Sequence, residues 1–170
     1  MKYLAVFLLI GCLASPAWST ERDVALEEFV QKLEKAKPWT REKIETLLES
    51  RFTKISSTGV VISHDMSGSF VRGKGLIFNE ISFSVLTTTG EALYVEATLD
   101  DKSSCFTWEQ IKNSYPGGSV DFMDVASGGE VYYAKKLSGG DILFGFDGRK
   151  DGNCLTSITV RTNLFLKVEK

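Results

Sequence analysis

The chain has 170 residues, of which 43% are hydrophobic and 25% are charged, and its net charge at pH 7 is −2. This length predicts one domain large enough to bury a hydrophobic core. The ordinary composition excludes a disordered, collagen-like or coiled-coil chain. The slight acidic excess argues against nucleic acids and anionic membrane surfaces as partners, because both attract basic patches.

The first 19 residues have the three parts of a secretory signal peptide. Lys2 supplies the positive charge, residues 4–10 form a short apolar run, and Ala17 and Ser19 put small residues at the −3 and −1 positions of a cleavage site. The apolar run is too short to span a bilayer. We therefore expect export and cleavage after Ser19 or Ala17. The mature domain would cover residues 20–170, and loss of Lys2 changes its net charge from −2 to −3.

Cysteine usage agrees with export. Cys12 ends a Leu-Ile-Gly-Cys segment that resembles the acylation site of bacterial lipoproteins, so a lipid anchor is an alternative to simple cleavage. The mature domain keeps Cys105 and Cys154, and an even pair predicts a disulfide in an oxidising compartment. Two free thiols are the alternative. The short leader and the lack of Asn-x-Ser/Thr sequons favour the bacterial periplasm.

Helical periodicity governs the start of the mature chain. Apolar residues recur at three- and four-residue spacing over residues 26–33, which predicts a helix that Pro38 ends. A second helix is expected after Thr40, with its apolar face over residues 44–48. Neither helix is long enough to be stable alone, so both must pack on another surface.

Beyond residue 51 the apolar period changes to two, which predicts antiparallel strands. We expect strands at residues 52–63 and 70–78, with a polar loop at residues 64–69 between them. A hairpin of residues 81–85 and 93–99 follows.

A short helix over residues 108–114 is predicted next, because Thr107 and Gln110 match a capping box. Further strands are expected near residues 120–122, 131–133, 142–146 and 155–166. The chain has no internal sequence repeat and no strand–helix–strand rhythm. The predicted fold class is therefore α+β: an N-terminal helical hairpin packed on an antiparallel β-meander with one short inserted helix.

No group of residues identifies a reaction, a cofactor or a metal. His64, Asp65 and Ser67 are close in sequence, but catalytic triads assemble from different elements, and one histidine excludes a His-rich metal site. Residues 147–153 resemble a calcium loop, but Arg149 stands where an oxygen donor is needed. A hydrolase that uses two unmarked carboxylates stays open, because sequence spacing cannot reveal such a pair.

Aromatic residues are concentrated in the second half of the chain. Tyr132 and Tyr133 are consecutive, so on a strand they would face opposite ways, and we expect one of them to be outward. An outward tyrosine suits a protein-contact surface.

In its leader, mature size and cysteine pair, the chain resembles the small periplasmic immunity proteins that neutralise wall-degrading effectors delivered by type VI secretion. We expect a non-enzymatic protein without a cofactor, because the sequence has no recognisable catalytic or cofactor-binding group. Its partner would be another protein, a secreted wall hydrolase, whose active site it blocks with a loop or a sheet edge.

An envelope assembly or structural accessory protein is the alternative. Two helices followed by a meander also resemble the small domains of outer-membrane assembly lipoproteins and of secreted β-lactamase inhibitor modules. For contact with a partner, we expect the loops at residues 64–69, 115–119 and 147–153. The candidate contact residues are His64, Asp65, Met66, Tyr115, Tyr132, Asp147, Arg149 and Asp151.

Overall fold

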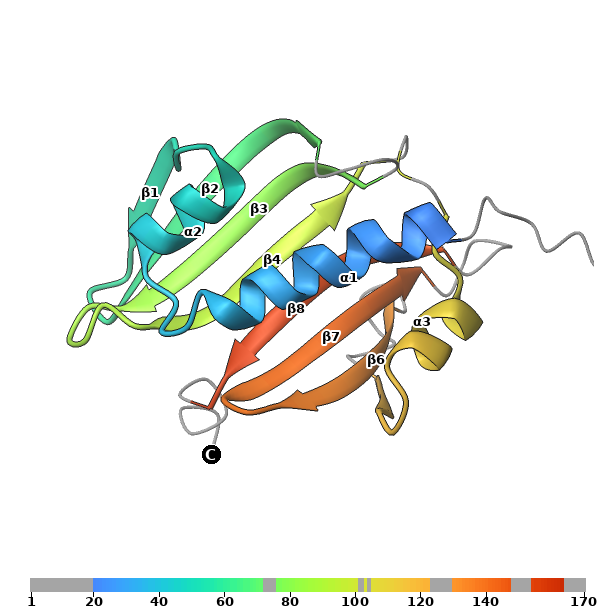
Figure 1. Ribbon diagram of the computed structural model, residues 1–170. Coiled ribbons are helices and arrows are strands. Elements are labelled where there is room, and N and C mark those ends of the chain that lie inside the picture. The colour runs from blue at the N-terminus through green and yellow to red at the C-terminus, as the bar shows by residue number, and fades with distance from the viewer. Residues whose placement is uncertain are drawn as a thin grey trace, which may run out of the picture.

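The computed structural model of the protein describes residues 20–71, 76–100, 103, 105–122, 130–147 and 154–163. These residues form three helices and one eight-stranded antiparallel sheet, which confirms the α+β class (Figure 1). The helices are α1 (Thr20–Lys35), α2 (Arg41–Leu48) and α3 (Trp108–Ser114). The strands are β1 (Lys54–Ser57), β2 (Val61–Val71), β3 (Ile77–Leu86), β4 (Ala92–Leu99), β5 (Ser119–Phe122), β6 (Glu130–Leu137), β7 (Gly140–Asp147) and β8 (Leu155–Thr162).

The sheet consists of two meanders joined at its centre. The strand order is β1-β2-β3-β4-β8-β7-β6-β5. The two meanders therefore join where their last strands, β4 and β8, pair with each other. Each meander of four strands follows a helical segment, α1 and α2 in the first half and α3 in the second. The two halves therefore share one topology, although the sequence has no internal repeat.

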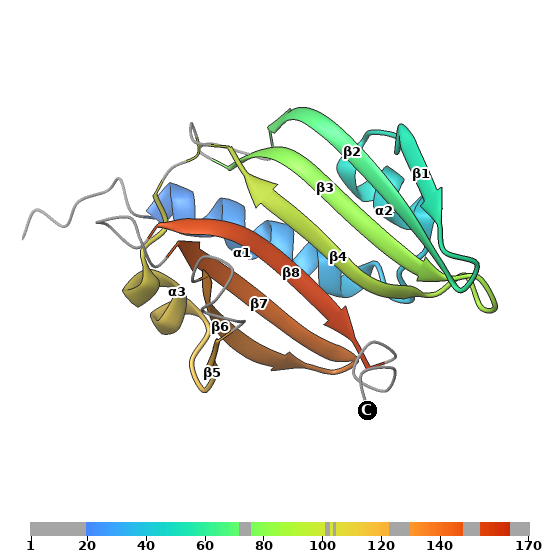
Figure 2. The ribbon, with the colours of Figure 1, turned by 180° about the vertical axis from the view of Figure 1, so that it is seen from behind.

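All three helices pack on the same face of the sheet, which we call the inner face. Phe29 of α1 contacts Phe78 of β3 with 4.8 Å between ring centroids, and Trp108 of α3 contacts Phe146 of β7 at 5.0 Å. Seen from behind, the strands lie in front of α1 and α2 (Figure 2). None of the helices in the described part of the chain is long and apolar enough to span a membrane.

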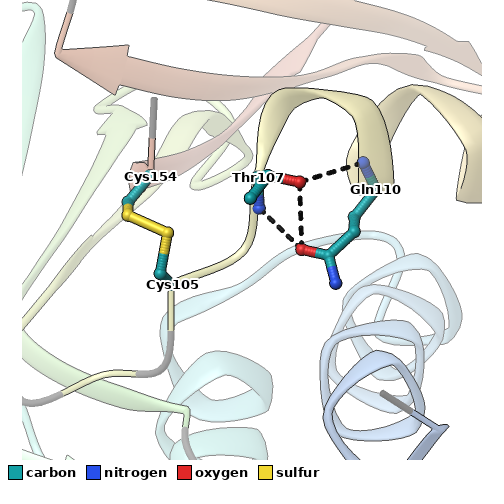
Figure 3. The surroundings of a disulfide bond; sticks show 4 residues. All are labelled: Cys105, Thr107, Gln110 and Cys154. Carbon is teal, nitrogen blue, oxygen red and sulfur yellow. Dashed lines mark hydrogen bonds between the residues drawn. A yellow bond between two sulfur atoms is a disulfide. The ribbon is translucent and has the colours of Figure 1, made fainter. Parts of the chain in front are cut away.

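Local sequence signals placed the helices correctly. The helix predicted at residues 108–114 is α3, whose capping box is formed: the Thr107 hydroxyl accepts from Gln110 N–H, and the Gln110 side chain accepts from Thr107 N–H at 2.8 Å (Figure 3). The helix expected after Thr40 is α2, although the Thr40 side chain makes no capping hydrogen bond.

The prediction for residues 52–78 was wrong in its boundaries. The segment predicted as one strand at 52–63 is β1, a turn at Gly59 and the start of β2. The second predicted strand, at 70–78, is the end of β2 and the start of β3, which pair with each other through Phe70 and Phe78. The turn was missed because β-branched residues continue through it, which hides the chain reversal.

The polar loop predicted at residues 64–69 lies entirely within β2. The side chains of Ser63 and Asp65 alternate with those of His64 and Met66, which face the core. This is the period-two pattern of a half-buried strand, but its outward positions are short polar residues typical of loops.

Candidate functional site

The structure separates the three candidate contact residues of β2. His64 and Met66 lie on the inner face and are buried, with exposed fractions of 6% and 1%. Asp65 lies between them and faces the opposite side, which we call the outer face. The expectation that these residues form one surface loop is therefore wrong, because consecutive residues of a strand point to opposite faces.

His64 is a core residue with an unusual environment. Its ring contacts Phe52 and Phe83, at centroid distances of 5.8 and 5.9 Å, and those two rings stack on each other at 5.7 Å. Its Nδ1 is buried without a hydrogen-bond partner. Burial lowers the pKa of His64 below its ordinary value of 6.5, and the nearby positive charge of Arg41 lowers it further. A neutral histidine packed against two aromatic rings suits a structural role.

The two consecutive tyrosines do face opposite ways, but both are buried. Tyr133 is on the inner face, where its hydroxyl donates to Tyr115 O at 2.7 Å and accepts from Gly118 N–H at 2.9 Å. Tyr132 is on the outer face with an exposed fraction of 7%. Its ring packs over Gly145, where a Cβ atom would come within 2.9 Å of the ring. The expected exposed tyrosine is therefore not found at this pair.

The other candidates differ in their placement. Tyr115 is half-buried at the end of α3, and its ring contacts Phe144 at 4.7 Å between centroids. Asp147 ends β7 and is half-buried. Arg149 and Asp151 lie outside the described residues, as does the predicted leader with Cys12. Cys105 and Cys154 form the predicted disulfide, which joins the segment before α3 to the residue before β8 (Figure 3).

A different set of residues forms the best candidate site. Tyr94, Arg161, Asp141 and Lys136 are consecutive partners across β4, β8, β7 and β6, and we call them the outer row. Their neighbours along each strand, such as Val95 and Val160, face the core. The outer row therefore crosses the centre of the outer face, over the junction of the two meanders.

Asp141 anchors the outer row electrostatically. Arg161 donates to it through two hydrogen bonds, Nε to Oδ1 at 3.1 Å and Nη2 to Oδ2 at 3.0 Å. Lys136 Nζ lies 3.9 Å from the same Oδ2. The exposed fractions of the Asp141, Arg161 and Lys136 side chains are 3%, 13% and 83%. The paired, fork-shaped contact with Asp141 thus fixes the Arg161 guanidinium plane, whereas the exposed Lys136 ammonium is only attracted by the same carboxylate.

Gly140 allows the strands to approach closely at this point. A Cβ atom there would lie 1.9 Å from the carbonyl oxygen of Arg161, and the residue has a φ of +154°. Only glycine permits this contact, so the position of Arg161 next to Asp141 depends on a residue without a side chain.

Polar side chains continue from the outer row along the sheet. The adjacent cross-strand row contains Asp65, Ser82, Glu96 and Thr159, all half-buried. The outer face therefore has carboxylates over β2, β4 and β7 and cations over β6 and β8. Among the described residues, no three His, Cys, Asp or Glu side chains come close enough together to hold a metal ion.

Compared with known proteins, the chain matches no family model, no curated protein and no solved structure. The outer row was missed in the sequence because its members come from four strands. The one available signal was Tyr94, an aromatic residue at an outward position between two apolar residues of the predicted hairpin.

Proposed function

We propose that this protein is an exported, non-enzymatic binding protein that inhibits a secreted cell-wall hydrolase and docks on it through the outer row. The leader and the Cys105–Cys154 disulfide support export, because disulfides persist in oxidising compartments. The resemblance to periplasmic immunity proteins supports the class of partner.

The observation that carries the proposal is the arrangement of Tyr94 beside an Arg161 held by Asp141. Tyrosine and arginine dominate the binding energy of protein interfaces. An arginine already oriented by a buried carboxylate loses little side-chain entropy when a partner binds, which favours affinity. The exposed Lys136 extends the same row and adds charge at its rim.

The test is inhibition of a purified hydrolase. Secreted wall hydrolases encoded next to the gene are the first candidates, and the readout is the release of soluble fragments from peptidoglycan. We expect the disulfide-bonded protein to inhibit such an enzyme at a one-to-one ratio. Tyr94→Ala should weaken inhibition about 30-fold, the loss typical of a central interface tyrosine.

Two variants with the same change in charge locate the interface. Lys136→Glu alters the outer row, whereas Lys112→Glu alters an exposed position of α3 on the other side of the sheet. Only the first should slow association and weaken inhibition. Equal effects of both variants, or wall-degrading activity of the protein itself, contradict the proposal.

A further inference from the structure

A cleft of about 210 Å³ lies at one end of the sheet, where four segments distant in sequence meet. Its walls are residues 37–39 between α1 and α2, residues 91–92 at the start of β4, Gly139 in the β6–β7 turn, and residues 162–163 at the end of β8. The cleft is separate from the outer row, and nothing in the proposed function uses it.

Hydrogen bonds between these segments fix the walls. Ala92 N–H donates to Trp39 O at 3.2 Å, and the Thr162 hydroxyl donates to Ala92 O at 2.9 Å. Asn163 N–H donates to Gly139 O at 3.1 Å. Each bond joins two different segments, so the cleft is a formed feature of the fold.

The apolar part of the lining is rigid. Trp39 has an exposed fraction of 4%, and its indole N–H donates to Leu33 O at 2.6 Å, which locks the ring. Pro38 and Ala92 add further apolar surface. A ligand here must therefore offer an apolar group.

Two residues of opposite charge, Lys37 and Glu91, line the same cleft. Lys37 Nζ lies 3.3 Å from the Ser138 hydroxyl and 5.2 Å from the centre of the Trp39 ring. An ammonium group carries three donors, so further acceptors can bind to it. In the described part of the chain, neither Lys37 nor Glu91 forms an ion pair. A ligand with both a carboxylate and an ammonium group matches this pair of charges.

We propose that this cleft binds a free α-amino acid with an apolar side chain. The carboxylate would pair with Lys37, the ammonium group with Glu91, and the side chain would contact Trp39 and Ala92. The volume supports a ligand of this size, because pockets for larger small molecules span roughly 300 to 1,000 Å³.

Isothermal titration of the disulfide-bonded protein with L-leucine and L-phenylalanine tests the proposal. We expect one-to-one binding of at least one of them. N-acetyl-L-leucine, which lacks the ammonium group, and L-leucinamide, which lacks the carboxylate, should each bind at least about tenfold more weakly, the effect of removing one charged hydrogen bond.

Two variants test whether the charges of the cleft bind the ligand, and two control variants remove the same charges elsewhere. Lys37→Gln and Glu91→Gln should each weaken leucine binding by about tenfold or more. Lys112→Gln and Glu109→Gln remove exposed charges from α3 and should leave binding unchanged. The melting temperature of each variant establishes that it is folded.

Several results overturn the proposal. The first is that neither amino acid binds. The second is that N-acetyl-L-leucine or L-leucinamide binds as tightly as leucine. The third is that both Lys37→Gln and Glu91→Gln bind leucine normally. Because the readout is binding of a small molecule, failure here is distinct from failure to inhibit a hydrolase.

Discussion

Removal of the disulfide gives the prediction with the best-defined magnitude. The bond joins two cysteines 49 residues apart in sequence and links the start of α3 to the start of β8. Closing a loop of this length lowers the entropy of the unfolded chain and stabilises the fold by about 4 kcal/mol in the chain-entropy model. The double variant Cys105→Ser/Cys154→Ser should lose that amount of unfolding free energy.

Urea denaturation followed by tryptophan fluorescence measures this loss. For a domain of this size the slope is roughly 2 kcal/mol per M, so the midpoint should fall by roughly 2 M. Cys105 is exposed, so a reducing agent should reach the bond. Reduction should therefore destabilise the wild-type protein by a similar amount and leave the double variant unchanged.

An entropic stabilisation by the disulfide is refuted if the double variant and the oxidised wild-type protein unfold within about 1 kcal/mol of each other. Equal shifts of both proteins on reduction would also refute it, because the reducing agent would then act elsewhere. Equal slopes in both proteins are needed for the comparison, since a changed slope indicates a changed unfolded state.

Three further changes test specific contacts by the same denaturation method. His64 is the chain's one histidine and its pKa is lowered on folding, so stability should fall as pH drops below 6.5, by at most about 1.4 kcal/mol per pH unit. His64→Leu should flatten the stability profile between pH 5 and 7, and an unchanged slope would refute the assignment. Tyr133→Phe removes the hydroxyl that joins Tyr115 O and Gly118 N–H and should cost about 1 to 2 kcal/mol, whereas no loss would contradict these bonds. Asp141→Ala leaves the Arg161 guanidinium without this partner and should cost about 3 kcal/mol, more than replacing both residues by apolar ones. If the protein with apolar residues at both 141 and 161 is less stable than Asp141→Ala, the result would count against the ion pair.

Local patterns in the sequence determined the helices, the central hairpin and the cysteine pair. The α3 boundaries follow from Thr107 and Gln110, because a capping box acts over three residues and needs no distant partner. The alternation of Val95, Ala97 and Leu99 identified the inward side of β4, because this pattern is also local and needs no distant partner. The disulfide followed from counting, since two cysteines lie beyond the predicted leader.

Contacts between distant segments decided the rest. The alternation of a strand shows which residues face the same way, but it does not reveal which strand lies alongside. Only the pairing of β4 with β8 brings Tyr94 next to Arg161. The cleft near Trp39 forms only because four segments that are distant in sequence meet there. Burial of Tyr132 likewise depends on Gly145 in the neighbouring strand. Strand order minimises the free energy of the whole sheet, so no short window of the sequence contains it.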